Sequence, residues 1–224
     1  MKFIHVAVAV LSLLSVGQSA PVSSCESLIQ PREINGTEQL LGTWTYIAEA
    51  TNIPSSTLLT EMFVESWRVK VTAANESDTM NFSQAKKMLG RCFTLTYKAT
   101  LEKNTLTSVI GHPLPFSTAL LSTGCPDCNV FYTNVTIGGR TVHSAKLISR
   151  RDKVAAAELE EFTKQVECLN LPAPAIMDPE KGFCSFETEV TNMTNTFAEV
   201  ESEVLSLIDS LNTEDGLKSL KERE

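Results

Sequence analysis

Two cysteines three residues apart, Cys125 and Cys128, have the spacing of a redox or metal-binding motif. A redox C-x-x-C motif needs a helix N-terminus to lower the pKa of its thiolate, whereas the segments on both sides of this pair alternate like strands. We therefore interpret the pair as a disulfide across a hairpin turn. Redox or metal-binding chemistry is the alternative.

The sequence contains no motif of histidine-based catalysis. Beyond the N-terminal segment the sequence holds His112 and His143, and neither stands in an H-E-x-x-H or nucleophile-elbow context. Gly138-Gly139 is the one glycine pair and is typical of a turn rather than of a phosphate loop. We expect a protein that is not an enzyme and holds no metal and no cofactor.

A carboxylate among aromatic side chains is a candidate binding feature. Between Thr60 and Thr72 the residues on one face include Phe63, Glu65 and Trp67, and we expect this face to point inward. A carboxylate beside aromatic rings suits a cationic ligand. The alternatives place Glu65 in water at a cavity mouth, or shift the register by one residue.

A second segment offers an analogous apolar face, made of Phe93, Leu95, Tyr97 and Ala99. Together the two faces provide the candidate ligand-binding residues of a cavity: Phe63, Glu65, Trp67, Phe93, Leu95 and Tyr97.

Short antiparallel strands must position these side chains. Between Gly42 and Ser149 the apolar residues tend to alternate, in segments separated by turn-forming clusters. We predict eight strands: Gly42–Ala50, Thr60–Thr72, Asp78–Gln84, Arg91–Leu101, Thr105–Gly111, Phe116–Ser122, Asn129–Ile137 and Thr141–Ser149. Eight such strands suit a closed up-and-down β-barrel (an all-β fold) that is filled by side chains or holds one small ligand, with a two-sheet sandwich as the main alternative.

One helix should follow the strands, over Asp152–Leu169, with Asp152 capping its start. Its apolar stripe would dock on the barrel. The stripe consists of Val154, Leu159, Phe162, Val166 and Leu169.

The segment 185–224 differs in composition, with ten acidic residues and three basic ones. Apolar residues recur there with heptad spacing between Phe186 and Leu211, which predicts an acidic amphipathic helix. Packing on the barrel or self-association, contact with lipid, and disorder remain three open readings of this tail.

The N-terminus has the charged, apolar and small-residue regions of a secretory signal peptide, which we place at residues 1–19. A signal anchor is the alternative, although the apolar run is short for a bilayer span. Residues 20–184 would form the folded domain of a secreted, extracellular protein. Five glycosylation sequons then become usable: Asn35, Asn75, Asn81, Asn134 and Asn192.

Charge argues against a nucleic-acid partner. The 224 residues include 19 Lys and Arg against 27 Asp and Glu, a formal net charge of −8, so no basic surplus exists to contact phosphates. No later segment is long and apolar enough to be a transmembrane span.

Several motifs carry a resemblance to a known family. Gly42-Thr43-Trp44 at the start of the first strand resembles the G-x-W motif of the lipocalins. The segments around Cys25, around Asn35, and from Leu159 to Pro172 are similar to the alpha-1-acid glycoprotein (orosomucoid) type of lipocalin. Within that type the chain looks closest to the fish tributyltin-binding proteins and the pufferfish saxitoxin and tetrodotoxin binding proteins.

The resemblance implies two disulfides, Cys25–Cys168 and Cys92–Cys184. It also implies that Trp44 closes the barrel base under an arginine, either Arg150 or Arg151. By resemblance the protein is a secreted carrier of small hydrophobic or cationic molecules such as xenobiotics, toxins, organotins, drugs or steroids. The alternative is an acute-phase or immunomodulatory glycoprotein that acts through its surface and glycans.

Overall fold

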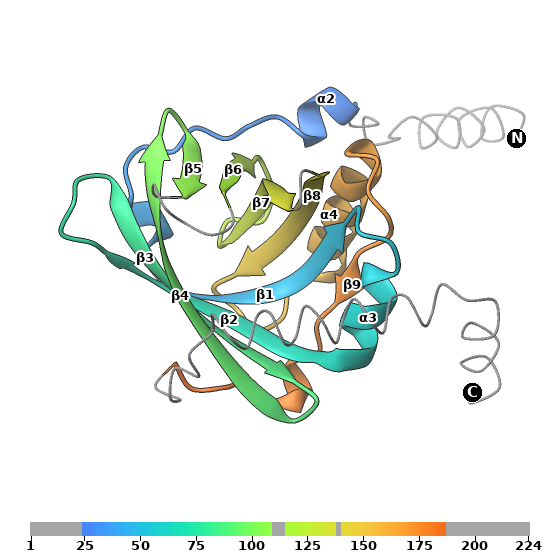
Figure 1. Cartoon of the computed structure of the whole chain (residues 1–224). Coiled ribbons are helices and arrows are strands. Elements are labelled where there is room, and N and C mark those ends of the chain that lie inside the picture. Colours follow the sequence, from blue (N-terminus) through green and yellow to red (C-terminus); the bar gives the residue numbers. More distant parts are fainter. Residues whose placement is uncertain (1–23, 109–114, 138–139, 187–224) are drawn as a thin grey trace, which may run out of the picture.

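The chain folds into a closed antiparallel barrel with one added strand (Figure 1). The computed structural model describes residues 24–108, 115–137 and 140–186. The strands are β1 (Gly42–Thr51), β2 (Val64–Ala73), β3 (Thr79–Met88), β4 (Arg91–Glu102), β5 (Thr105–Ser108), β6 (Phe116–Leu121), β7 (Cys128–Ile137), β8 (Arg140–Ser149) and β9 (Ala175–Ile176). The helices are α2 (Cys25–Leu28), α3 (Ser56–Phe63) and α4 (Ala156–Cys168), with 3-10 turns η2 (Glu38–Leu40) and η3 (Pro179–Lys181).

Pairing of the first strand with both of its neighbours closes the barrel. Strands β2 to β8 pair in sequence order, β8 pairs with β1, and β1 pairs again with β2, where Gly42 lies opposite Val71. The predicted eight-stranded barrel is therefore confirmed and the two-sheet sandwich is excluded. Strand β9 pairs with β1 at Ala48 and Glu49, along the part of the β1 edge that lies beyond its pairing with β2.

The second predicted strand was wrong at its start. The expected strand began at Thr60, but Ser56–Phe63 forms α3 and the strand begins at Val64. Apolar residues at 58, 59, 62 and 63 fit a helix, and the alternation that defines the strand begins only after them. Strand β3 also runs on to Met88, past the expected end at Gln84.

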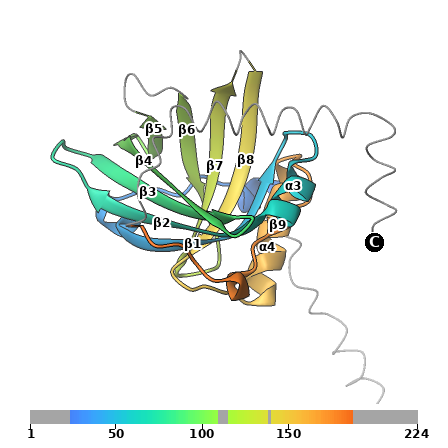
Figure 2. The ribbon, with the colours of Figure 1, turned by 60° about the horizontal axis from the view of Figure 1, so that its bottom comes forward.

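Helix α4 packs on the outer wall of the barrel (Figure 2). Phe162 and Val166 are buried there against Ile47 and Leu147, as the apolar stripe predicts. The helix starts at Ala156 rather than Asp152. Glu158 accepts a hydrogen bond from the main-chain N–H of residue 155 at 2.7 Å and so satisfies a donor at the helix start.

Asp152 lies outside the helix because its carboxylate is engaged elsewhere. It accepts hydrogen bonds from Arg68 at 2.6 Å and from Thr45 at 2.9 Å. These contacts tie the segment after β8 to the outer faces of β1 and β2. The predicted cap is thus replaced by a tertiary ion pair.

Three disulfides fasten the segments that flank the barrel. Cys25 bonds to Cys168 and links the N-terminal arm to the end of α4. Cys92 bonds to Cys184 and holds the C-terminal segment against β4. Cys125 in the β6–β7 connection bonds to Cys128, the first residue of β7. The pairings implied by the resemblance and the expected hairpin bridge are all present.

Trp44 closes one end of the barrel, which we call the base. The guanidinium carbon of Arg150 lies 3.5 Å from the centre of its ring, and the indole N–H donates to the carbonyl of Leu40 at 2.8 Å. Arg150 also donates to the carbonyls of Leu41 at 2.6 Å and Thr43 at 3.1 Å. Of the two arginines considered, Arg150 therefore covers the tryptophan.

Gly42 makes room for this arrangement. Its φ of +99° is one that other residues rarely adopt, and a Cβ there would lie 2.7 Å from Nη1 of Arg150.

Some expectations fall outside the described residues. They are the signal peptide at 1–19, the tail after Phe186 with its heptad pattern, the sequon at Asn192, and residues 109–111 of the fifth predicted strand. Among the residues that are described, no helix is long and apolar enough to cross a membrane.

Candidate functional site

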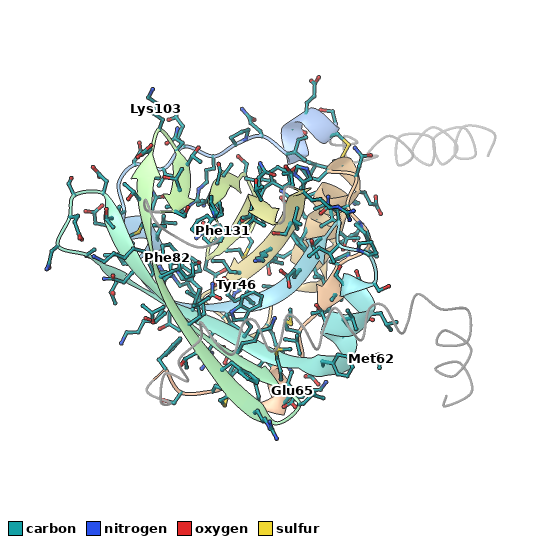
Figure 3. The ribbon with its side chains drawn as sticks, viewed as in Figure 1. Tyr46, Met62, Glu65, Phe82, Lys103 and Phe131 are labelled. Atoms are coloured by element: carbon teal, nitrogen blue, oxygen red, sulfur yellow. A yellow bond between two sulfur atoms is a disulfide. The ribbon has the colours of Figure 1, made fainter. Side chains whose placement is uncertain are left out.

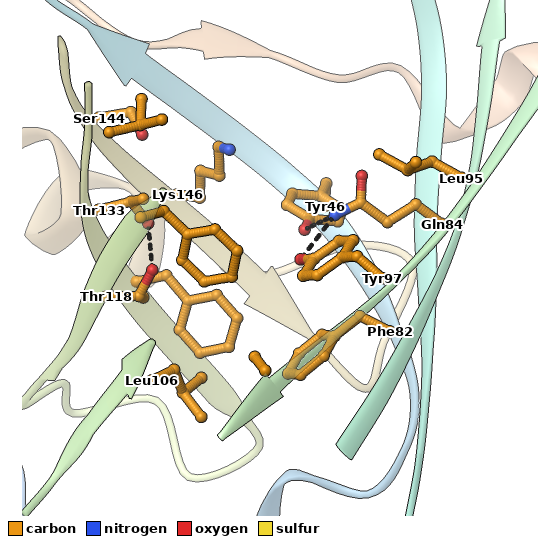
Figure 4. Close-up of a pocket in the computed structure, with 14 residues that line it drawn as sticks. Tyr46, Phe82, Gln84, Leu95, Tyr97, Leu106, Thr118, Thr133, Ser144 and Lys146 are labelled. Atoms are coloured by element: carbon orange, nitrogen blue, oxygen red, sulfur yellow. Dashed lines mark hydrogen bonds between the residues drawn. The ribbon is translucent and has the colours of Figure 1, made fainter. Parts of the chain in front are cut away.

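The barrel encloses a cavity of about 220 Å³ between the base and the opposite end, which we call the mouth. Its walls come from β1 and from strands β3 to β8 (Figure 4). The lining residues are Tyr46, Phe82, Gln84, Leu95, Tyr97, Ala99, Leu106, Phe116, Thr118, Phe131, Thr133, Val135, Ser144 and Lys146. Such a mostly apolar lining with a few polar groups is the usual design of a small-molecule site.

Aromatic rings make up much of the wall. Phe82 stacks on Tyr97 with ring centres 5.2 Å apart, and Phe116 meets Tyr97 edge to face at 5.6 Å. Phe131 extends the apolar surface across the cavity from β7 (Figure 3). Each buried ring offers a large apolar area to a ligand, so transfer from water would supply most of the binding energy.

One polar group bridges two tyrosines in the wall. The amide nitrogen of Gln84 donates to the hydroxyl oxygens of Tyr97 at 3.1 Å and Tyr46 at 3.4 Å. Burial raises the pKa of Tyr97 to about 12, partly offset by the hydrogen bond from Gln84. Burial also raises the pKa of Tyr46, and nearby Tyr97 and Glu49 raise it further. Both phenols are therefore neutral at physiological pH.

Two lysines bring positive charge to one side of the cavity. Lys146 of β8 lines the cavity and forms an ion pair with Glu49 of β1 at 3.4 Å. Lys86 of β3 lies near it, with its Nζ 4.4 Å from the ring centre of Trp67. Burial lowers the pKa of Lys86, with Glu49 acting in the opposite direction.

Only some of the predicted ligand-binding residues line the cavity. Leu95 and Tyr97 line the cavity, whereas Phe93 precedes them on the same strand face and lies outside the lining. Trp67 is buried behind Tyr46, with which it stacks at 4.0 Å. Phe63 is the last residue of α3 rather than a strand residue.

Glu65 does not share the inner face with Trp67. Val64 pairs with Met88 and Ser66 with Lys87, so Glu65 is the extra residue of a β-bulge. The bulge breaks the alternation, and Glu65 lies at the edge of the barrel in Figure 3. Its carboxylate forms an ion pair with Lys87 at 3.0 Å and accepts from the N–H of Gly90 at 2.6 Å.

These contacts lower the pKa of Glu65, the hydrogen bond from Lys87 most of all. The prediction that the Glu65 carboxylate lies inside the cavity is therefore wrong, since this carboxylate forms an ion pair with Lys87 at the rim of the barrel. Its physical cause is one inserted residue, which sequence periodicity does not reveal.

Most of the lining was missed at the sequence level. Phe82, Phe116, Phe131 and Lys146 lie on strands that were predicted, but no inner face was assigned to those strands. Alternation along β7 would have found Phe131, Thr133 and Val135 together. No comparable signal pairs Lys86 with Lys146, because the two come from separate strands.

The C-x-x-C pair is not a thiolate site, since its sulfurs are bonded to each other. Asp127 between them accepts hydrogen bonds from Arg151 at 2.7 and 2.8 Å, and Arg151 also donates to Glu158 of α4. This network lowers the pKa of Asp127, chiefly through the hydrogen bond from Arg151. The hairpin thus joins the barrel base to the helix.

Four sequons lie among the described residues. Asn35 and Asn75 are exposed, and Asn81 and Asn134 are partly buried. The side-chain oxygen of Asn134 lies 2.6 Å from Nδ1 of His143, and the amide of Asn81 donates to Ala73. The surface therefore presents Asn35 and Asn75 most openly.

Comparisons with known proteins agree with the barrel. The sequence profile of a family described as the ApoM domain matches residues 9–188. A solved structure titled "The Siderocalin Ex-FABP functions through dual ligand specificities" matches with a TM-score of 0.55 and 18% identity, covering 62% of this chain and 93% of that chain. At that identity the likeness shows the fold alone. None of the curated proteins compared with the chain matches it.

Proposed function

Because the chain belongs to the ApoM domain family, a lipocalin-like family, we propose that it is a secreted carrier that sequesters a small, mainly hydrophobic molecule in the barrel cavity. The observation that carries this proposal is the apolar cavity of about 220 Å³, walled by Phe82, Phe116 and Phe131. Binding, without a catalytic step, is the function that such a lining supports.

Secretion is part of the proposal. The N-terminal signal-peptide pattern predicts export, and three disulfides are typical of a protein that folds in an oxidising compartment. The sequence likeness to alpha-1-acid glycoprotein and to the fish toxin-binding proteins extends the proposal to xenobiotics as ligands. The domain would span residues 20–184 and the tail 185–224.

A cation is a less suitable ligand than the sequence indicated. Glu65 is held at the rim by Lys87, and Glu49 is paired with Lys146. A cationic ligand would have to displace Lys146 from Glu49 in the presence of Lys86. We therefore give first place to apolar ligands without positive charge.

Titration with N-phenyl-1-naphthylamine, a neutral apolar probe whose fluorescence rises in apolar surroundings, tests the carrier function. We expect one molecule to bind per chain. Leu95→Trp should fill part of the cavity and weaken binding roughly tenfold or more, about 1.4 kcal/mol. Thr96→Trp adds the same group on the exposed face of the same strand and should leave binding unchanged.

Failure of the wild-type chain to bind this probe would refute the carrier function. Native mass spectrometry of the secreted protein adds a second measurement, since a carrier should copurify with a reproducible small molecule. An empty cavity that no probe enters would instead favour the surface-acting glycoprotein.

A further inference from the structure

The exposed apolar side chains of the barrel gather around helix α3. In the described part of the chain, four large apolar side chains are exposed, by 41 to 68%. Helix α3 packs beside β9, as Figures 1 and 2 both show, and the N–H of Leu89 donates to the carbonyl of Phe63 at the end of α3, at 3.2 Å. We call the four side chains the α3 patch. They are Leu58 and Met62 of α3, Leu89 of the β3–β4 turn and Ile176 of β9.

The α3 patch lies at the mouth end of the barrel, because β1 runs from Trp44 at the base to Thr51, shortly before α3. Leu58 and Met62 are one helical turn apart and therefore share one face of α3. Single exposed apolar side chains are common, whereas apolar side chains that gather on one surface mark a place where another element or molecule binds. The occupant of the patch must bring an apolar face of its own.

The C-terminal segment leaves the folded domain next to this patch. Cys184 is bonded to Cys92, which lies three residues after Leu89. From Cys184 the chain continues for 40 residues, to Glu224. A segment tethered this closely meets the patch at an effective concentration of about millimolar, which a free partner would have to match.

The sequence of this segment supplies an apolar face of sufficient length. Eight apolar residues recur with heptad spacing from Phe186 to Leu211, with no Gly or Pro between them, and we call them the seam. A helix over these 26 residues would be about 39 Å long. Five Thr and Asn residues between positions 191 and 196 are weak helix formers, so the helix needs a surface on which to pack its seam.

The charges around the patch and the seam are complementary. Among the described residues Arg91 and Lys181 form no ion pair. Arg91 follows Leu89 by two residues, and the carbonyl of Lys181 accepts a hydrogen bond from Lys87 at 2.6 Å. These three basic residues outnumber the acidic residues beside the patch, Glu61 and Glu65. The seam is flanked on both sides by acidic residues, namely Glu187, Glu189, Glu201 and Glu203.

We propose that residues 186–211 form an amphipathic helix whose seam docks on the α3 patch of the same chain. The helix would cover Leu58, Met62 and Leu89, place its acidic flanks near Arg91 and Lys181, and lie beside the mouth of the barrel. A second copy of the chain and a lipid surface are the other possible occupants of the patch, and the experiments below separate them.

Photo-crosslinking of the full-length secreted chain identifies the occupant directly. Benzoylphenylalanine at Met62 should join, on irradiation, to peptides from residues 186–211 of the same chain, as detected by mass spectrometry of the monomer. The same group at Lys103, which lies at the opposite end of the barrel in Figure 3, should give no such product. Products that join two chains, or the absence of any product with the segment, would overturn the proposal.

Two leucines of the segment form a matched pair for a second measurement. Leu207 belongs to the seam, whereas Leu205 falls on another face of the expected helix. Docking should protect the segment from endoproteinase Glu-C, which cleaves after glutamate. Leu207→Ser should accelerate cleavage after Glu203 roughly tenfold or more, while Leu205→Ser should leave the rate within about twofold. Equal rates for the two variants would contradict docking.

The patch itself is tested from the other side. Leu58→Ser combined with Met62→Ser should accelerate the same cleavage roughly tenfold or more, and circular dichroism verifies that the barrel is intact. An unchanged rate would exclude the α3 patch as the docking surface. Flotation with phosphatidylcholine vesicles tests the lipid surface, and we expect the wild-type chain to stay unbound. Vesicle binding that Leu207→Ser abolishes would assign the seam to lipid and overturn the proposal.

Discussion

The lengths of the loops that the disulfides close predict unequal contributions to stability. Cys92 and Cys184 are 92 residues apart, whereas Cys125 and Cys128 are three apart. In the chain-entropy description a bridge stabilises by restricting the unfolded chain, and the effect grows with the logarithm of the loop length. The long bridge should therefore contribute more than the hairpin bridge.

The magnitudes follow from the loop lengths. A separation of 92 corresponds to about 4.6 kcal/mol and a separation of three to about 2 kcal/mol. The Cys25–Cys168 bridge already shortens part of the long loop, which reduces the first value to about 4 kcal/mol. We expect the two bridges to differ by about 2 kcal/mol.

Urea denaturation of two double variants tests this difference. Cys92→Ala with Cys184→Ala removes the long bridge, and Cys125→Ala with Cys128→Ala removes the short one. Without the long bridge the unfolded chain exposes more surface, so the slope m of the free energy of unfolding against urea concentration should rise. The variants are therefore compared by their free energies of unfolding extrapolated to zero urea. A short-bridge variant that loses as much stability as the long-bridge variant would refute the reasoning.

Three further perturbations have defined expectations. Gly42→Ala should lower the free energy of unfolding by about 1–3 kcal/mol in urea titrations, because Gly42 has a φ of +99° and lies close to Arg150. The loss should be larger than for Gly90→Ala, because a Cβ at Gly90 has no neighbouring atom within 4 Å. Tyr97 loses its proton near pH 10 in the unfolded chain, but burial raises its pKa to about 12 in the native state. The free energy of unfolding should therefore fall by about 2–3 kcal/mol as the pH rises from about 10 to about 12. Tyr97→Phe should flatten that pH dependence, and an unchanged slope would contradict the assignment. Gln165→Leu should lower the free energy of unfolding by about 2 kcal/mol in thermal or urea unfolding, since the buried amide of Gln165 donates to two main-chain carbonyls at 2.8 and 2.7 Å. A loss of less than about 0.5 kcal/mol, the scatter of surface substitutions, would exclude that role.

Local patterns predicted most of the barrel because strands with one buried face alternate in polarity. The strands from Arg91 to Ser149 were placed to within a few residues, apart from the end of the fifth, which lies outside the described residues. The stripe on the helix likewise predicted burial of Phe162 and Val166. Each of these features depends on neighbours along the chain, which a sequence displays directly.

The same periodicity failed where the backbone departs from it. The bulge at Glu65 moved that carboxylate to the rim, and the helix before Val64 removed Phe63 from the strand. A bulge inserts one residue without any consistent mark in composition, so every side chain before it changes face. The expected cation site depended on this register and was lost with it.

The sequence by itself determined a lipocalin-like chain of eight strands and a docked helix, with cysteines able to fasten its ends. Only the tertiary structure decided which side chains meet in the cavity. Lys86 and Lys146 lie 60 residues apart and come together on Trp67 because β1 pairs with both β8 and β2 when the barrel closes. Closure is a long-range event, and the charge it gathers inside the barrel is therefore invisible to any local pattern.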